Sequence, residues 1–329
     1  MGGMHAQVYA RLERAKVVGV VDANQNVAAA NARRLKLNVP LYQDMRLALA
    51  ELPVDVVDVC LPTHLHAAFV RQALKARKHV FCEKPFAPSA TEARALAAAA
   101  QRAGVKMQIG HCLRFWPEYQ ALVIFVRRRS AGRLLSLSMQ RRCGRPTGSV
   151  GDWLNHAHLS GGAVLDLHVH DTDFVHHLLG CPDAVTAVGT KDRSGWSHIF
   201  TTYHFAGVAV TAEGGWNYPP SWGFQMAFQA VFEHGTMEFD SRSDPTLVVT
   251  AKGGVRKPLA FAQPKIREAT ASSGNISALG GYFNELAYFV DCLERDRKPQ
   301  IATPRQAAES VRTVMAEIKS AQTGRTVRL

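Results

Sequence analysis

The sequence of 329 residues has no apolar run near the ~20 residues that a membrane span needs, and no secretory-type apolar segment. It also lacks any CxxC spacing, and several of its cysteines sit in apolar runs. The six cysteines are Cys60, Cys82, Cys112, Cys143, Cys181 and Cys292. This usage favours buried free thiols over disulfides or a zinc knuckle. We therefore expect no membrane partner and a cytoplasmic location.

Acidic residues are few relative to basic ones, which gives a formal net charge of +12. Apart from Arg127–Arg129 and the pair Arg141–Arg142, the basic residues are spread along the chain without interleaved aromatics. A nucleic-acid surface gathers its basic residues in a patch or stripe. The charge therefore argues against nucleic acid and indicates a general preference for anionic ligands, a dinucleotide included.

The length predicts two domains, because single hydrophobic cores stop growing near ~250–300 residues. We place the boundary at residues 112–113. The first part alternates apolar strands with helices of 10–15 residues, which is typical of a parallel sheet. The expected strands are 16–22, 39–42, 54–62, 78–82 and 105–110. The expected helices are 26–37, 44–51, 64–76 and 89–103, with Thr63 and Ser89 as candidate caps.

Beyond Gly110 the pattern changes to one of alternating strands. A helix at 116–129, a strand at 134–142, a polar loop at 143–160 and a helix at 162–179 lead into antiparallel strands over 184–250. Residues 252–277 are rich in Gly, Pro and Ser and are predicted to form a long irregular segment, an excursion from the sheet. Helices at 279–294 and 304–321 and a last strand at 326–329 follow. These patterns predict an α+β domain with a large, mostly antiparallel open sheet.

Glycines that would cradle a dinucleotide are nearly absent, since only Gly2 and Gly3 precede the first helical pattern. Asp22, however, ends an apolar strand where a dinucleotide fold places the acid that binds the adenosine ribose. Its charge would repel a 2′-phosphate, which favours NAD over NADP. The competing interpretation is that Asp22 only begins a turn.

A polar stop, Glu83-Lys84-Pro85, ends the apolar run 79–82. In an open α/β sheet, ligands bind beyond the carboxyl ends of the strands, so Glu83 and Lys84 would point into a site. The competing interpretation is a capped surface turn.

A second group of polar residues follows Gly161-Gly162. On a helix, Asp166, His170, Asp173 and His177 would share one face, and a histidine near neutrality is a natural proton acceptor for an alcohol. Two alternatives stay open here: a structural hydrogen-bond network and a metal site. The candidate ligands for the latter are His156, His158, His168, His170, Asp171 and Asp173.

Together these motifs resemble the glucose–fructose oxidoreductase / inositol dehydrogenase (Gfo/Idh/MocA) family. The resemblance rests on Val-Val-Asp22, Leu-Pro62-Thr63-His64-Leu-His66, Glu83-Lys84-Pro85, Gly110-His111 with Arg114-Phe115, and Gly161-Gly162 with Asp166-xxx-His170-xx-Asp173. Members have an N-terminal Rossmann domain and a C-terminal α/β domain whose open sheet often forms dimers or tetramers. They commonly oxidise or reduce a hydroxyl or carbonyl of a sugar, sugar acid or inositol with NAD(P).

The resemblance implies roles for individual residues and a cis peptide before Pro85. Lys84 would hydrogen-bond the reacting oxygen, Asp166 would contact substrate, and His170 would be the general base. The implied cofactor-binding residues are Gly2, Gly3, Asp22, Leu61, Pro62, Thr63, His66, Glu83 and Lys84. The implied cofactor is NAD, with NADP as the alternative, and no metal is implied.

Two features depart from the family pattern. His168 stands where many members have glycine, so we expect its imidazole to project near the substrate pocket. At the start of the chain, the first strand and two of the three motif glycines are missing, and we expect the native gene to start upstream.

Substrate contacts are predicted in the loop before the 162–179 helix, at Trp153, Asn155, His156 and His158, and at Arg114 for a carboxylate or phosphate. The predicted function is an NAD(P)-dependent sugar or polyol oxidoreductase that forms a homodimer or homotetramer. The alternatives are a non-catalytic dinucleotide-fold sensor and an enzyme that uses tightly bound NAD transiently, such as an epimerase or redox-assisted glycosidase.

Overall fold

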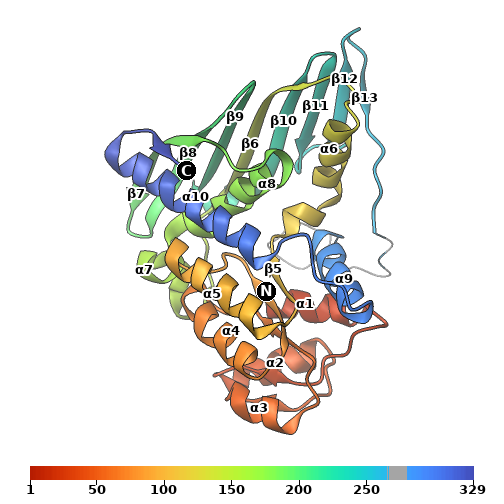
Figure 1. Cartoon of the computed structure of the whole chain (residues 1–329), viewed down its shortest axis with the longest axis vertical. Coiled ribbons are helices and arrows are strands. Elements are labelled where there is room, and N and C mark those ends of the chain that lie inside the picture. The colour runs from red at the N-terminus through yellow and green to blue at the C-terminus, as the bar shows by residue number, and fades with distance from the viewer. Residues whose placement is uncertain (265, 267–279) are drawn as a thin grey trace.

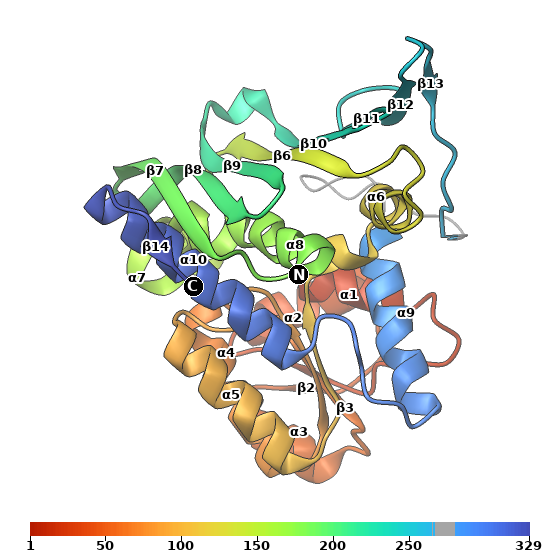
Figure 2. The same ribbon diagram turned by 45° about the horizontal axis from the view of Figure 1, so that its top comes forward.

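The computed structural model describes residues 1–264, 266 and 280–329. Figures 1 and 2 show two layers of strands, with helices α8 and α10 between the large sheet and the N-terminal strands. No helix in these ranges is long and apolar enough to cross a membrane.

The N-terminal part alternates parallel strands with helices, as predicted. Its strands are β1 (Val20–Val21), β2 (Leu41–Tyr42), β3 (Val56–Val59), β4 (His79–Glu83) and β5 (Met107–Gly110). Its helices are α1 (Gly2–Tyr9), α2 (Gln25–Arg34), α3 (Met45–Glu51), α4 (His66–Lys75) and α5 (Ala90–Ala103). The strands form two separate parallel sheets, β1-β2 and β3-β4-β5. β1 and β3 are shorter than expected because each pairs on one side only.

One of the two predicted caps is confirmed. Ser89 caps α5 by accepting the Glu92 N–H at 3.2 Å, and Gly104 ends that helix with φ +71°. Thr63 was the wrong choice: a 3-10 turn, Thr63–Leu65, intervenes, α4 begins at His66, and the Thr63 side chain makes no capping bond.

The C-terminal part is built on one nine-stranded sheet, in which all pairings except β6 with β9 are antiparallel. Its strands are β6 (Leu134–Gly144), β7 (Ala184–Asp192), β8 (Gly195–Phe205), β9 (Val208–Tyr218), β10 (Phe224–Phe232), β11 (Gly235–Asp240), β12 (Leu247–Ala251), β13 (Arg256–Pro258) and β14 (Val327–Arg328). The order is β13-β12-β11-β10-β6-β9-β8-β7-β14. The mostly antiparallel sheet is therefore confirmed. The predicted excursion at 252–277 contains β13, and its residues 265 and 267–277 lie outside the described ranges.

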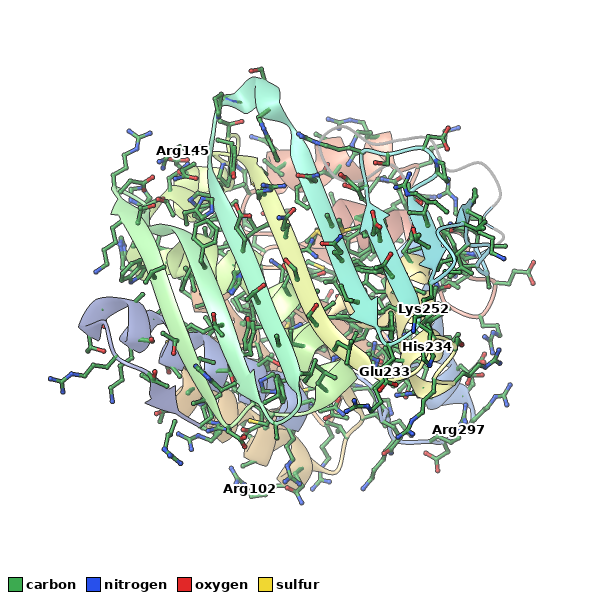
Figure 3. The ribbon with its side chains drawn as sticks, turned by 90° about the horizontal axis from the view of Figure 1, so that it is seen from above. Arg102, Arg145, Glu233, His234, Lys252 and Arg297 are labelled. Carbon is green, nitrogen blue, oxygen red and sulfur yellow. The ribbon has the colours of Figure 1, made fainter. Side chains whose placement is uncertain are left out.

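Helices cover one face of this sheet and leave the other open (Figure 3). The covering helices are α6 (Pro117–Arg127), α8 (Val169–Leu179) and α10 (Pro304–Thr323). β8 shows the consequence: Ile199, Thr201 and Tyr203 are buried, whereas Phe200 and Thr202 between them are exposed. This period of two is what a half-buried strand requires.

Two further helices connect the layers. The short α7 (Ala157–Ser160) lies in the predicted 143–160 loop and packs against the Thr63–Leu65 turn. α9 (Gly280–Glu294) returns to the N-terminal part and packs against α1, where Leu286 and Phe289 join Val8 and Phe81 in one buried cluster (Figure 1).

The predicted 162–179 helix is divided. Residues Val164–His168 form a π-helical turn, and α8 follows from Val169. Gly161 and Gly162 precede the turn with φ +76° and +75°. A β-carbon on Gly162 would lie 2.8 Å from the carbonyl oxygen of Trp196, so only glycine fits there without moving backbone.

We predict that Gly162→Ala destabilises the fold more than Gly207→Ala. Gly207 also has positive φ, +80°, but a β-carbon there would meet nothing within 4 Å. The left-handed backbone alone costs an alanine about 1–2 kcal/mol, and the clash at Gly162 should bring the loss to about 3 kcal/mol or more. Denaturant unfolding measures both, and equal losses would contradict the packing argument.

Candidate active site

The end of β4 presents the Glu83-Lys84-Pro85 segment at the edge where three parallel strands finish. The Lys84–Pro85 peptide is cis, as the resemblance implies. The Glu83 side chain is buried, and its Oε2 accepts the Lys84 backbone N–H at 3.0 Å. The alternative of a capped surface turn is therefore wrong.

Lys84 reaches Asp166 across 82 positions of the chain. Its Nζ donates to the Asp166 carbonyl oxygen at 2.7 Å and lies 3.2 Å from Asp166 Oδ1. The two side chains are 14% and 18% exposed, so the pair is largely shielded but open to a ligand. Asp166 lies in the π-helical turn, a local geometry that often occurs at functional sites.

His170 follows one turn later, at the start of α8, and is half-buried. Its Nδ1 lies 4.0 Å from Cys112 Sγ, and among the described residues its Nε2 has no hydrogen-bond partner. Burial, and then the charges of Lys84 and Arg141, lower the pKa of His170 well below 6.5. The imidazole is therefore neutral at pH 7 and able to accept a proton.

Asp173 and Arg114 are engaged with each other, which corrects the prediction that Arg114 binds substrate. Arg114 is buried and donates to both carboxylate oxygens of Asp173, at 2.7 and 2.8 Å. Ser310 donates to the same carboxylate at 2.8 Å. Burial opposes ionisation of Asp173, but Arg114 and His111 bring the pKa of its carboxyl below the usual range. The bidentate buried pair joins the Cys112–Phe115 turn to α8, and Ser310 links the same carboxylate to α10.

His168 also departs from its prediction. Its ring is fully buried, with Nε2 3.3 Å from Tyr203 Oη and 3.3 Å from Glu317 Oε2, so it does not project into a substrate pocket. Gly214 on β9 makes room for it, since a β-carbon there would lie 2.5 Å from His168 Nδ1. The imidazole of His168 is thus accommodated by a glycine on the strand that faces it.

The six residues considered as metal ligands do not converge. Asp171 pairs with Arg141 at 2.7 Å, Asp173 pairs with Arg114, and His168 points into the core. These contacts instead agree with the alternative of a structural hydrogen-bond network for part of the motif. His177, half-buried at the far end of the predicted face, has its pKa lowered to about 4 by burial and by Arg114.

The loop before the π-helical turn holds the other predicted substrate residues. Trp153 is half-buried, while His156 and His158 are exposed with ring centroids 5.8 Å apart. Asn155 is buried and donates to the Pro146 carbonyl at 2.9 Å and to Asp152 at 2.7 Å. Because α7 packs against the Thr63–Leu65 turn, this loop lies beside the predicted cofactor segment. Its role in substrate binding stays a prediction.

Some of the predicted cofactor residues suit a dinucleotide. Asp22 follows β1, and its Oδ1 accepts the Asn24 N–H at 2.8 Å, which leaves capacity for ribose hydroxyls. Thr63 Oγ1 is buried and has no hydrogen-bond partner within the described ranges, so its hydroxyl could bond to a cofactor. Gly2 and Gly3 lie in the first turn of α1.

His66, another predicted cofactor residue, ties the segments that follow β3 and β4 together. Its ring nitrogens lie 2.8 Å from the Leu61 carbonyl oxygen and 2.9 Å from the Pro85 carbonyl oxygen. Burial lowers the pKa of His66. The contact fixes the chain after β3, including Pro62, against the chain after β4.

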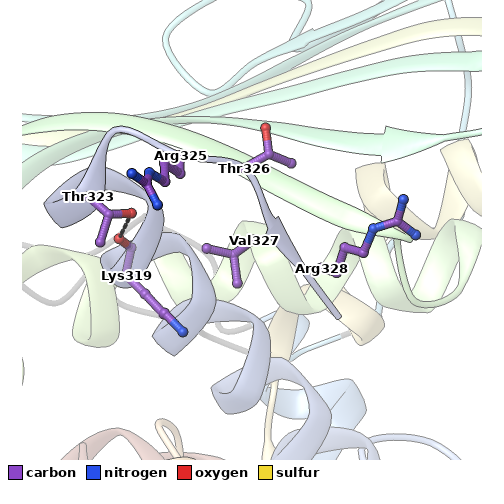
Figure 4. Close-up of a pocket in the computed structure, with 6 residues that line it drawn as sticks. All are labelled: Lys319, Thr323, Arg325, Thr326, Val327 and Arg328. Carbon is purple, nitrogen blue, oxygen red and sulfur yellow. Dashed lines mark hydrogen bonds between the residues drawn. The ribbon is translucent and has the colours of Figure 1, made fainter.

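Two surface grooves lie away from these residues. One of about 650 Å³ is lined by Lys319, Thr323, Arg325, Thr326, Val327 and Arg328 beside β14 (Figure 4). A second of about 700 Å³ shares Thr326 and Arg328 with it. Neither contains a predicted site residue.

Parallel strands with a ligand edge, covered by a second domain with an open sheet, define a Rossmann-type α/β protein. Residues 1–111 match the family model described as "Oxidoreductase family, NAD-binding Rossmann fold", and residues 119–238 match the GFO/IDH/MocA C-terminal domain. The chain belongs to the Gfo/Idh/MocA oxidoreductase family, which confirms the resemblance and the fold class.

Individual relatives agree with this assignment. The chain is 30% identical to inositol 2-dehydrogenase 1 of Paenarthrobacter aurescens, over 77% of this chain and 75% of that protein. It is 28% identical to the uncharacterized oxidoreductase YrbE of Bacillus subtilis, over 58% of this chain but only 54% of that protein. Matches to other curated relatives likewise span about half of their length or less.

A solved structure shows the same fold over the whole chain. Levoglucosan dehydrogenase in complex with NADH and levoglucosan superposes with a TM-score of 0.84, covering 100% of this chain and 96% of that one, at 23% identity.

We predict that replacing Lys84 raises the pKa of His170. Loss of a neighbouring positive charge favours the protonated imidazole, so the pKa in Lys84→Met should move back toward 6.5. NMR titration of the histidine ring protons measures the shift. Lys106→Met is the matched control, because Lys106 pairs with Asp296 and does not act on His170. An unchanged His170 pKa in Lys84→Met would contradict the proposed proximity.

Proposed function

We propose that the protein is an NAD-dependent oxidoreductase that transfers a hydride between the nicotinamide and a CH–OH or carbonyl carbon of a sugar, sugar acid or inositol. The observation that carries this proposal is the meeting of Lys84, from the end of β4, with Asp166, one turn before the neutral His170. Family membership and the relation to an inositol dehydrogenase support the substrate class.

In this proposal the bound nicotinamide supplies the hydride acceptor, and the chain handles the proton and the charge. Lys84 Nζ already gives hydrogen bonds to Asp166, and an ammonium has three to donate, so one remains for the reacting oxygen. It stabilises the alkoxide that develops there. His170 accepts the hydroxyl proton at its free Nε2, and Asp166 holds the lysine in place. In the reducing direction His170 returns the proton.

Asp22 sets the cofactor preference in this proposal. Its carboxylate accepts hydrogen bonds from ribose hydroxyls and repels a 2′-phosphate, so NAD is preferred over NADP. Trp153, Asn155 and His158 are proposed to contact the sugar. Trp153 is half-buried and offers an apolar face for a ring, and His158 is exposed beside His156. Asn155 makes a smaller contribution because its amide is already bonded within the loop.

A substrate screen on sugars, inositols and sugar acids, followed by NADH absorbance, tests the proposal. Lys84→Ala should lower kcat by roughly 10²–10⁴-fold if the lysine assists proton transfer. Lys106→Ala, which changes a half-buried lysine paired with Asp296 away from the site, is the matched control and should keep full activity. Equal turnover by wild type and Lys84→Ala would refute the role of Lys84. NAD that survives purification without net turnover would instead favour transient use of the cofactor.

We also propose that the open face of the large sheet pairs two copies of the chain. The face carries exposed apolar side chains, Val188 at 63% and Phe200 at 51%, on neighbouring strands β7 and β8. Exposed groups of this kind mark association surfaces when they gather on one face.

Phe200→Glu should therefore dissociate the oligomer, because two buried carboxylates would face each other across a twofold axis. Light scattering after gel filtration measures the mass. Val255→Glu, which changes an exposed valine outside the sheet face, is the control. A monomeric wild type, or an unchanged oligomer in Phe200→Glu, would contradict this proposal.

A further inference from the structure

A buried acid, Glu285 on α9, lies behind the Lys84 segment and is used by none of the steps above. Its exposure is 0%, and neither carboxylate oxygen has a hydrogen-bond partner among the described residues. A buried ionised carboxylate without partners costs several kcal/mol or more. Either Glu285 is neutral, or something compensates its charge.

Its neighbours are His5 on α1 and Glu83 on β4. The ligand-type atoms of these three side chains all lie within 4.8 Å of one another. His5 sits between two acids, with Nδ1 2.8 Å from Asp58 Oδ2 and Nε2 3.0 Å from Glu83 Oε1. Both ring nitrogens can donate only in the charged imidazolium. Burial opposes that charge, but Asp58 and Cys60 raise the pKa of His5 well above 6.5.

The charges around Glu285 decide its state. One imidazolium faces the carboxylates of Asp58 and Glu83, so the cluster is already negative by one before Glu285 is counted. Tyr9, Cys112 and Tyr282 also face Glu285, and burial raises the pKa of each, so they are neutral. Cys60 and Gln108 also belong to this surrounding. Two cations lie near Glu83: Lys84, which pairs with Asp166, and the amino group of Met1. Ionised Glu285 would thus place a further negative charge beside Glu83 and Asp58 in a dry site. Burial, and then the charge of Glu83, raise the pKa of Glu285.

We propose that Glu285 is a protonated carboxylic acid that shares its proton with Glu83 and acts as a positioning residue for Lys84. Each oxygen of Glu83 accepts one bond, from His5 and from the Lys84 N–H, and each has capacity for another. This inference rests on the proposed function for its effect on turnover.

The path from Glu285 to the reacting site is short. Glu83 Oε2 holds the backbone N–H of Lys84, and a β-carbon at Gly110 would lie 3.2 Å from the Glu83 carboxylate, so the acid has little room to move. A shift of Glu83 would carry Lys84 away from the Asp166 carbonyl oxygen, now 2.7 Å from Nζ. α1 and α9, through His5 and Glu285, therefore act together on the lysine.

The proton itself can be observed without any substrate. We expect wild type at pH 7 to show the infrared carbonyl stretch of a protonated carboxylic acid that Glu285→Gln removes. Glu294→Gln is the control, because Glu294 lies on the same helix but pairs with Arg14 at the surface. A difference spectrum between wild type and Glu285→Gln without that band would overturn the proposal. Because this readout needs no turnover, it stands even if the screen finds no substrate.

Kinetics test the positioning role. Glu285→Ala should lower kcat by about 10–100-fold, the range expected for a misplaced catalytic group. Glu285→Gln should restore most of that loss, because glutamine is neutral, has the same shape and still donates a hydrogen bond.

The pH profile is a second test. Wild-type activity should fall as pH rises through the Glu285 pKa, because the shared proton is lost there, and Glu285→Gln should lack that decline.

Two further results would overturn the proposal. One is an equal loss in Glu285→Gln and Glu285→Ala. The other is a stoichiometric metal ion in wild type that Glu285→Gln releases, since a cation would then compensate the carboxylate. Thermal unfolding of each variant separates these results from a failure of Glu285→Ala to fold.

Discussion

The contact between Lys84 and Asp166 is the interaction on which the rest of the structure depends. An ammonium 14% exposed is tolerable only with acceptors at hand, and Asp166 supplies its carbonyl and carboxylate from a helix 82 positions away. Three features position Asp166: the π-helical turn that contains it, the two glycines before that turn, and the packing of α8 against the large sheet. The same ammonium helps keep His170 neutral, so one charge organises both the binding of an oxygen and the removal of its proton.

Local sequence signals predicted the elements well, because they depend on period and capping alone. The alternation of strands and helices and the Ser89 cap both follow from spacing. The directions of the side chains could not be predicted from spacing. Arg114 and His168 resembled ligand-binding groups, because a sequence does not show that Asp173 and Glu317 are their partners in the core. Only the assembled packing reveals such partners, and the one sequence signal for His168 was the small residue Gly214 on a distant strand.

The cluster of His5, Glu83 and Glu285 also could not be predicted from the sequence. His5 and Glu83 are 78 positions apart, and Glu285 lies on a helix that returns from the far end of the chain. No periodicity links them. Glu285 is recognised as unusual only from its burial and its hydrogen bonds together. A proton is the smallest charge that could compensate such a carboxylate. The division of the parallel strands into β1-β2 and β3-β4-β5 is likewise a finding of the structure.

The most direct test of the central claim is a double-mutant cycle on Lys84→Ala and His170→Gln, read as kcat/KM with the best polyol found. If both groups act on one oxygen, removing the second after the first should cost little more, as for residues that work as a unit. We predict a double variant close to the worse single variant. Losses that multiply would show that the two side chains act independently and would contradict a shared reacting centre.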